Sequence, residues 1–216
     1  MMFKDRADAA RKLAKKLEWL KKDKPIILAI PRGGVVTGNV IASELGATLD
    51  IIVSRKVGAP DNPELAIGAV LHDGSYFPNE RITIMLNVPQ NYINQEIAVQ
   101  MKEIERRLIR FRGTKEYNLE GKTVVLVDDG IATGATMFVA ALWVKKQKPK
   151  KLIIAIPVGP KETVDELNKM ADKVVVLDCP QFFNAVGEFY QEFNPVDDYE
   201  VQEIMSKRGY KIKVFE

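Results

Sequence analysis

The stretch VVLVDDGIATGAT (residues 124–136) joins four apolar residues to two acidic residues and a loop of small residues. Such a continuous apolar run is typical of a strand that is buried on both faces. The segment that follows, 135–148, has the apolar spacing and length of a helix. A buried strand followed by a helix is the repeating unit of a parallel α/β sheet, so this stretch indicates the fold class.

The rest of the chain repeats this alternation. Strands are predicted at 25–30, 49–54, 123–127, 152–158 and 174–178, helices at 5–22, 35–46, 89–113, 135–148, 161–171 and 196–207, and a weaker pair of strands at 66–71 and 81–86. We therefore expect a single domain over residues 1–216, with a three-layer α/β/α architecture around a central, mostly parallel sheet. Ligands bind such sheets at the carboxyl ends of the strands.

The composition argues against several classes of protein. Hydrophobic residues make up 46% and charged residues 28% of the 216 residues, as in globular proteins. The net charge of +3 gives no electrostatic reason to expect nucleic acid or a membrane as a partner. The basic run at 145–151 is interpreted as a solvated helix end, with a polyanion site as the alternative. Without a membrane-length apolar stretch or a signal-peptide pattern, the expected location is cytoplasmic.

One cysteine, Cys179, and one histidine, His72, limit the chemistry further. They exclude an internal disulfide and a zinc site with several cysteine ligands, and they argue against a Ser-His-Asp triad. We expect Cys179 to be a small buried residue near the edge of the site. His72 is interpreted as an ordinary residue of a lid or hairpin.

The loop after strand 123–127 has the composition of an anion site. Gly130 and Gly134 let the backbone approach a ligand closely. Thr133 and Thr136 add hydroxyl donors beside a helix N-terminus, whose free N–H groups attract anions. These groups suit a phosphate monoester.

The two acids before this loop, Asp128 and Asp129, cannot bind the phosphate, because like charges repel. They can accept hydrogen bonds from a vicinal diol or hold Mg²⁺ through water. A phosphate beside a diol describes a ribose 5-phosphate. The alternative is that the acids only cap the turn and the helix, but a cap uses one carboxylate and leaves the second without a partner.

The same stretch resembles the phosphoribosyl pyrophosphate (PRPP) signature of the type I phosphoribosyltransferases, in which four apolar residues precede two acids and a T-G-x-T loop. The order of elements over residues 25–180 is also similar to that family. The resemblance implies that Asp128 and Asp129 bind the ribose hydroxyls, and Mg²⁺ through water. It implies that the 5-phosphate binds to Gly130, Ala132, Thr133, Gly134, Ala135 and Thr136.

A second loop, IPRGGV (30–35), follows the first predicted strand. Taken alone, it predicts only a turn before a helix. The resemblance implies that Arg32, Gly33 and Gly34 form the pyrophosphate loop, in which the family often has a cis peptide bond that does not involve proline.

The segment SRKVGAPDNPELAIG (54–68) lies where the family has the start of a flexible lid. We expect the lid at about 55–80, and the resemblance implies that Arg55 and Lys56 neutralise the leaving group. Two interpretations of Glu64 stay open. It orders the lid or acts as an acid or base, or it is a solvated loop carboxylate.

The tail at about 179–216 is rich in aromatic residues and is expected to form a C-terminal hood. Phe182 and Phe183, with Tyr190 and Phe193, are candidates to stack on a base, and the alternative is that they form the core under a final helix. RKVGAPDNPELAIGAV (55–70) and FFNAVGEFYQEF (182–193) resemble a stand-alone "predicted phosphoribosyltransferase" group, which does not specify the acceptor.

The resemblance implies an enzyme that binds PRPP with Mg²⁺ and transfers the 5-phosphoribosyl group to a nitrogenous base, purine or pyrimidine, with release of pyrophosphate. The alternative is a PRPP-binding sensor or regulator that uses the same pocket with little turnover. A dinucleotide-binding oxidoreductase is disfavoured, because PRGGVVTG (31–38) stands where GxGxxG would be expected. Homodimers are common in the resembled family, so a homodimer is a further expectation.

Overall fold

A computed structural model describes residues 1–212 of the chain. Its centre is a five-stranded parallel sheet with the order β2-β1-β6-β7-β8. The strands are β1 (Ile26–Ala29), β2 (Thr48–Ile51), β6 (Thr123–Val127), β7 (Lys151–Val158) and β8 (Lys173–Asp178). The predicted fold class and the five predicted strands of the central sheet are therefore confirmed.

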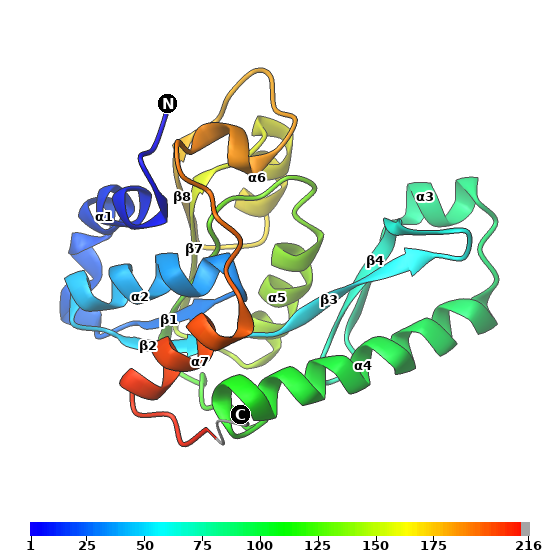
Figure 1. Cartoon of the computed structure of the whole chain (residues 1–216), viewed down its shortest axis with the longest axis horizontal. Helices are drawn as coiled ribbons and strands as arrows, with labels where there is room; N and C mark the ends of the chain where they lie inside the picture. Colours follow the sequence, from blue (N-terminus) through cyan, green and yellow to red (C-terminus); the bar gives the residue numbers. More distant parts are fainter. Residues whose placement is uncertain (213–216) are drawn as a thin grey trace.

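Helices cover both faces of this sheet (Figure 1). The helices are α1 (Arg6–Lys16), α2 (Gly33–Leu45), α5 (Ala135–Lys146), α6 (Lys161–Asn168) and α7 (Asp198–Lys207). Alternate strand residues serve the two faces: Ile27 and Val125 pack in the core with α1 and α2, whereas Leu126 packs in the core with α5 and α6. Because both faces are buried, the strands are mainly apolar rather than alternating with polar residues, and Asp50 of β2 is an exception.

A second, antiparallel sheet extends away from the central sheet (Figure 1). Its strands are β3 (Ser54–Ala59), β4 (Asn62–Leu71) and β5 (Tyr76–Pro78), and the chain returns through α3 (Glu80–Met85) and the long helix α4 (Gln90–Arg112). We call these elements the arm. The predicted lid at 55–80 therefore consists largely of regular strands.

The prediction of a strand at 81–86 is wrong, because residues 81–85 belong to the helix α3. The side chain of Asn79 accepts a hydrogen bond from the N–H of Ile82 at 3.3 Å and starts the helix. Ile82 packs against the core, but the side chains of Ile84 and Met85 are exposed. The pattern that suggested a strand in this segment therefore does not correspond to a buried face of a sheet.

Several further boundaries differ from the sequence prediction, and two of these differences have a local cause. The helix predicted at 5–22 ends at Lys16, and a 3₁₀ helix, η1 (Glu18–Asp23), continues from it. Leu13 of α1 and Leu20 of η1 are both buried in the same hydrophobic core, which is why the spacing of leucines indicated one helix. The final helix begins at Asp198 rather than at residue 196, because the side chain of Asp197 accepts from the N–H of Glu200 at 2.8 Å as its cap.

A buried ion pair joins the end of α4 to the central sheet. The guanidinium of Arg112 donates to both carboxylate oxygens of Asp50, at 2.6 and 2.9 Å, and both side chains are largely buried. This bidentate contact fixes the base of the arm against β2.

None of the helices within residues 1–212 is long and apolar enough to cross a membrane.

Candidate functional site

The two acids of the quoted stretch lie together at the carboxyl end of β6. The Nε of Arg6 donates to Oδ2 of Asp129 at 2.6 Å, and the N–H of Asp129 donates to Oδ1 of Asp128 at 2.8 Å. Burial, and then the neighbouring charge of Asp129, raise the pKa of Asp128 well above its ordinary value. Asp128 therefore keeps its proton more readily than an exposed carboxyl group does, beside Asp129, which forms an ion pair with Arg6.

The loop after these acids leads into the N-terminus of α5, as the sequence predicts. Gly130 and Gly134 have positive φ angles of 154° and 74°, and Gly134 is the residue before the helix. No side chain in residues 1–212 caps α5. Its first N–H groups are therefore available to an anion, and the adjacent Thr133 is exposed.

The loop before α2 lies directly against the two acids. The peptide bond between Pro31 and Arg32 is cis, which is the geometry that the family resemblance implies. A Cβ on Gly33 would lie 1.8 Å from Oδ2 of Asp129, and one on Gly34 would lie 2.9 Å from Oδ1 of Asp128. Only glycine allows this approach, so the structure brings the two predicted loops into one site.

The side chain of Arg32 lies half-exposed beside this loop. Its Nη1 contacts Oδ1 of Asp198, the first residue of α7, at 3.4 Å. The loop at 30–35 is therefore linked to the C-terminal helix by a charged contact.

The predicted lid residues are not brought to the acid pair. Arg55 donates to Gln100 of α4 at 2.9 Å, and Lys56 forms an ion pair with Glu64 at 2.5 Å across the β3–β4 hairpin. The hydrogen bond from Lys56 lowers the pKa of Glu64. Lys56 and Glu64 do line a cleft of about 830 Å³ whose other wall includes Thr133, so the arm faces the phosphate loop.

The hood contacts the site through Tyr190 and Phe193, two of the aromatic residues predicted to stack on a base, and not through Phe182 and Phe183. The hydroxyl of Tyr190 donates to the carbonyl oxygen of Asp129 at 2.5 Å. The guanidinium of Arg6 lies 3.8 Å from the ring centroid of Phe193 and donates to the carbonyl of Asn194 at 2.8 Å. Arg6 thus joins three segments that lie far apart in the sequence.

Sequence reasoning missed Arg6, because a basic residue at the start of an amphipathic helix carries no signal of its own. Phe182 is 87% exposed, and Phe183 stacks on Phe189 with ring centroids 5.4 Å apart. Their predicted role in binding a base stays a prediction.

The predictions for the single cysteine and the single histidine had different outcomes. Cys179 is exposed, so the expectation that it would be buried is wrong: it follows the last residue of β8, where the chain leaves the sheet. His72 follows β4 and packs between the rings of Tyr117 and Trp143, with centroids 5.1 and 5.0 Å away. Burial lowers the pKa of His72, which is consistent with a neutral packing residue.

Comparison with known proteins agrees with this geometry. A model of the phosphoribosyl transferase domain matches residues 2–193, and the chain belongs to this family. Proteins from two strains of Mycobacterium tuberculosis, each named "Putative phosphoribosyl transferase", are 39% identical over 201 residues, which are 93% of this chain and 45% of theirs. The chain thus spans about half the length of these curated relatives.

A crystal structure of a protein from Thermus thermophilus is similar over almost its whole length. It is 39% identical, the match covers 96% of this chain and 99% of that one, and the TM-score is 0.80.

Proposed function

We propose that this chain is a PRPP-dependent phosphoribosyltransferase that transfers the 5-phosphoribosyl group to a purine or pyrimidine base. The observation that carries the proposal is the contact of Gly33 with Asp129, because it places the pyrophosphate loop beside the acids that follow β6. A diphosphate, a ribose and a 5-phosphate can then be bound side by side.

Each part of the site has a place in this reaction. The N–H groups at the start of α5, with Thr133 and Thr136, hold the 5-phosphate, and Asp128 and Asp129 accept hydrogen bonds from the ribose hydroxyls. The bond from ribose carbon 1 to the diphosphate oxygen breaks, and a nitrogen of the base forms the new bond to that carbon. The diphosphate leaves with its electron pair next to Arg32, whose charge stabilises it.

The carboxylates fit a shared magnesium ion rather than a closed metal site. No cluster of three or more acidic, histidine or cysteine side chains that could hold a metal occurs within residues 1–212. Mg²⁺ usually keeps several waters and binds through one or two carboxylates plus substrate phosphates. Asp128 and Asp129 would hold it in this way, and the ion would neutralise charge on the diphosphate.

The arm supplies the lid in this proposal. Lys56 and Glu64 already line the cleft beside the phosphate loop. Movement of the arm toward α5 would exclude water, which otherwise hydrolyses PRPP.

The experiment follows pyrophosphate release from PRPP and Mg²⁺ by phosphorus NMR, with a pool of purine and pyrimidine bases. The control is the double variant Asp128→Asn/Asp129→Asn, whose melting temperature is compared with that of the wild type. We expect release that depends on a base and is lost in the variant. PRPP that binds but stays intact would favour a sensor, and failure of PRPP to bind would overturn the proposal.

A further inference from the structure

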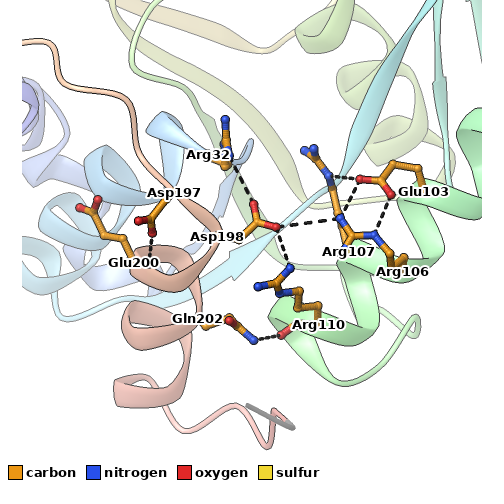
Figure 2. A network of polar contacts seen from close by, with 9 residues as sticks. All are labelled: Arg32, Glu103, Arg106, Arg107, Arg110, Asp197, Asp198, Glu200 and Gln202. Atoms are coloured by element: carbon orange, nitrogen blue, oxygen red, sulfur yellow. Dashed lines mark hydrogen bonds and ion pairs between the residues drawn. The ribbon is translucent and has the colours of Figure 1, made fainter. Parts of the chain in front are cut away.

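Four arginines gather beside the pyrophosphate loop, outside the acid pair (Figure 2). They are Arg32 of the loop and Arg106, Arg107 and Arg110 of α4, and we call them the arginine cluster. The carboxylate of Asp198 lies between Arg32 and α4, with N–O distances of 3.4 Å to Arg32, 3.1 Å to Arg110 and 3.9 Å to Arg106. One carboxylate thus faces three guanidinium groups.

The cluster carries more positive charge than its partners neutralise. The second carboxylate, that of Glu103, accepts hydrogen bonds from Arg106 and Arg107 at 2.7 to 2.9 Å. These contacts lower the pKa of Glu103 to about 2, so it is ionised at neutral pH. Four guanidinium groups therefore face two carboxylates, which leaves two positive charges in excess.

The arginines that face Asp198 are open to solvent. The exposed fractions of the side chains are 43% for Arg32, 49% for Arg106 and 33% for Arg110, against 20% for Asp198. Exposed ion pairs of this kind contribute little to stability, so the grouping of these charges is not explained by folding alone.

Asp198 is not needed as the helix cap of α7, so its carboxylate is available to the arginines. The helix cap of α7 is Asp197, whose side chain turns to the N–H of Glu200 and away from the arginines (Figure 2). The carboxylate of Asp198 has no capping contact to keep it in place. Its contacts with Arg32 and Arg106, at 3.4 and 3.9 Å, are longer than charged hydrogen bonds usually are.

We propose that the arginine cluster is a binding site for a phosphoanion, such as a diphosphate or triphosphate, and that Asp198 occupies it when no ligand is bound. Guanidinium groups bind phosphate oxygens in pairs of parallel hydrogen bonds, and a ligand with several negative charges can contact Arg32, Arg106 and Arg110 together. The single charge of Asp198 is a weaker competitor for the same groups.

Displacement of Asp198 would also affect the neighbouring site. Arg32 belongs to the pyrophosphate loop, and its contact with Asp198 holds it toward α7. A phosphoanion in the cluster therefore competes with the hood for this side chain. Its source in this proposal is a phosphorylated ligand separate from PRPP, because Arg106 and Arg110 belong to α4 and not to the two loops of the PRPP site.

The test measures binding of inorganic triphosphate by isothermal titration calorimetry, without base. We expect Arg106→Gln/Arg110→Gln to weaken binding about tenfold or more, because two charged contacts are lost. Asp198→Asn should strengthen it several-fold by removing the internal competitor. The matched control is Arg107→Gln, which removes the same charge from the same helix but no contact with Asp198, and should have a smaller effect.

A second titration with PRPP-saturated protein identifies the source. Triphosphate that still binds, with the same dependence on Arg106 and Arg110, assigns the cluster to a separate ligand. Binding that PRPP prevents would mean that the cluster is only part of the PRPP site, and would overturn the proposal of a separate ligand. Equal affinities for wild type and the double arginine variant, with melting temperatures unchanged, would overturn the proposal.

The single variant Arg106→Gln gives the same test if the double variant does not fold, because Arg106 is the most exposed of the three. The inference does not depend on the proposed function. Protein that binds triphosphate through Arg106 but fails to bind PRPP would keep this proposal and reject the other.

Discussion

Gly33 occupies a position in the site where any side chain would collide with Asp129. Because a Cβ there would lie 1.8 Å from the carboxylate of Asp129, Gly33→Ala must push Asp129 or the loop aside. We expect PRPP affinity to fall at least about tenfold, since the misplaced groups bind the ligand directly. Calorimetric titration with PRPP measures this, with the melting temperature as a check on folding. Unchanged affinity would show that the two loops do not act together.

Tyr190 and Arg6 hold Asp129 from two sides. Tyr190→Phe removes only the hydrogen bond to the carbonyl of Asp129, and we expect it to lower the free energy of unfolding by about 1 kcal/mol. Arg6→Gln should weaken PRPP binding more than Tyr190→Phe does, because it leaves the carboxylate of Asp129 without its charged partner. Chemical denaturation and PRPP titration separate the two effects. Equal PRPP affinities in both variants would contradict a positioning role for Arg6.

The sequence predicted which two loops the fold brings together, but it did not predict the residues that hold them in place. Asp128, Asp129, Gly33 and Gly134 belong to contiguous motifs whose chemistry can be read locally. The contact from Arg6 spans 123 positions in the sequence. Such a contact depends on how α1 packs, which local patterns do not contain.

Among the elements, α4 depends on its buried contact with β2. Asp50→Ala leaves the buried guanidinium of Arg112 without its carboxylate partner, and we expect a loss of about 3–5 kcal/mol in the free energy of unfolding. The control is Glu105→Ala, which breaks the exposed pair with Lys115 and should cost less than about 1 kcal/mol. Urea denaturation measures both. Similar losses in the two variants would show that the buried pair does not anchor the arm.

The stability of the protein at acid pH should depend on Glu103 of α4. Its pKa is about 2 in the folded protein against an ordinary value of 4.5, so its contribution is present above pH 4.5 and is lost as the pH falls toward 2. We expect about 1–2 kcal/mol less stability in wild type at the acid end, after allowance for solvent screening. Glu103→Gln should lose less over the same range. Parallel pH profiles for both proteins would contradict this assignment.

The elements also show why the sequence predicts a strand where α3 forms. The sequence RITIML alternates polar and apolar residues only over 81–84, and Asn79 provides a helix cap just before it. Period-two alternation over so few residues is weak evidence beside a local capping hydrogen bond. In the long buried strands of the central sheet, pattern and packing agree, and the prediction is confirmed.

For the whole molecule, the position of the arm relative to the site is the property to test. Cys179 is the chain's single cysteine and is exposed at the end of β8, so it accepts one spin label. A second label at Asp61→Cys, at the tip of the β3–β4 hairpin, reports the distance from the arm. We expect PRPP with Mg²⁺ to shorten this distance, because the arm closes over the bound substrate.

The control places the second label at Lys122→Cys, which adjoins β6 in the central sheet and should show no change. An arm distance that stays constant at saturating PRPP would mean that the arm does not act as a lid. The family resemblance implied a lid at this position. The sequence could not show that this segment folds into an antiparallel sheet carried on a long helix, because that depends on packing between distant segments.

The contacts of Arg6 have a consequence for the order of events during synthesis. Its partners are the carboxylate of Asp129 and the carbonyl of Asn194, so it is translated long before either of them. A nascent chain halted before residue 190 would carry both loops of the site but lack Tyr190 and Asn194. Ribosome-bound intermediates should therefore acquire the central sheet first and a fully assembled pocket only when the hood emerges.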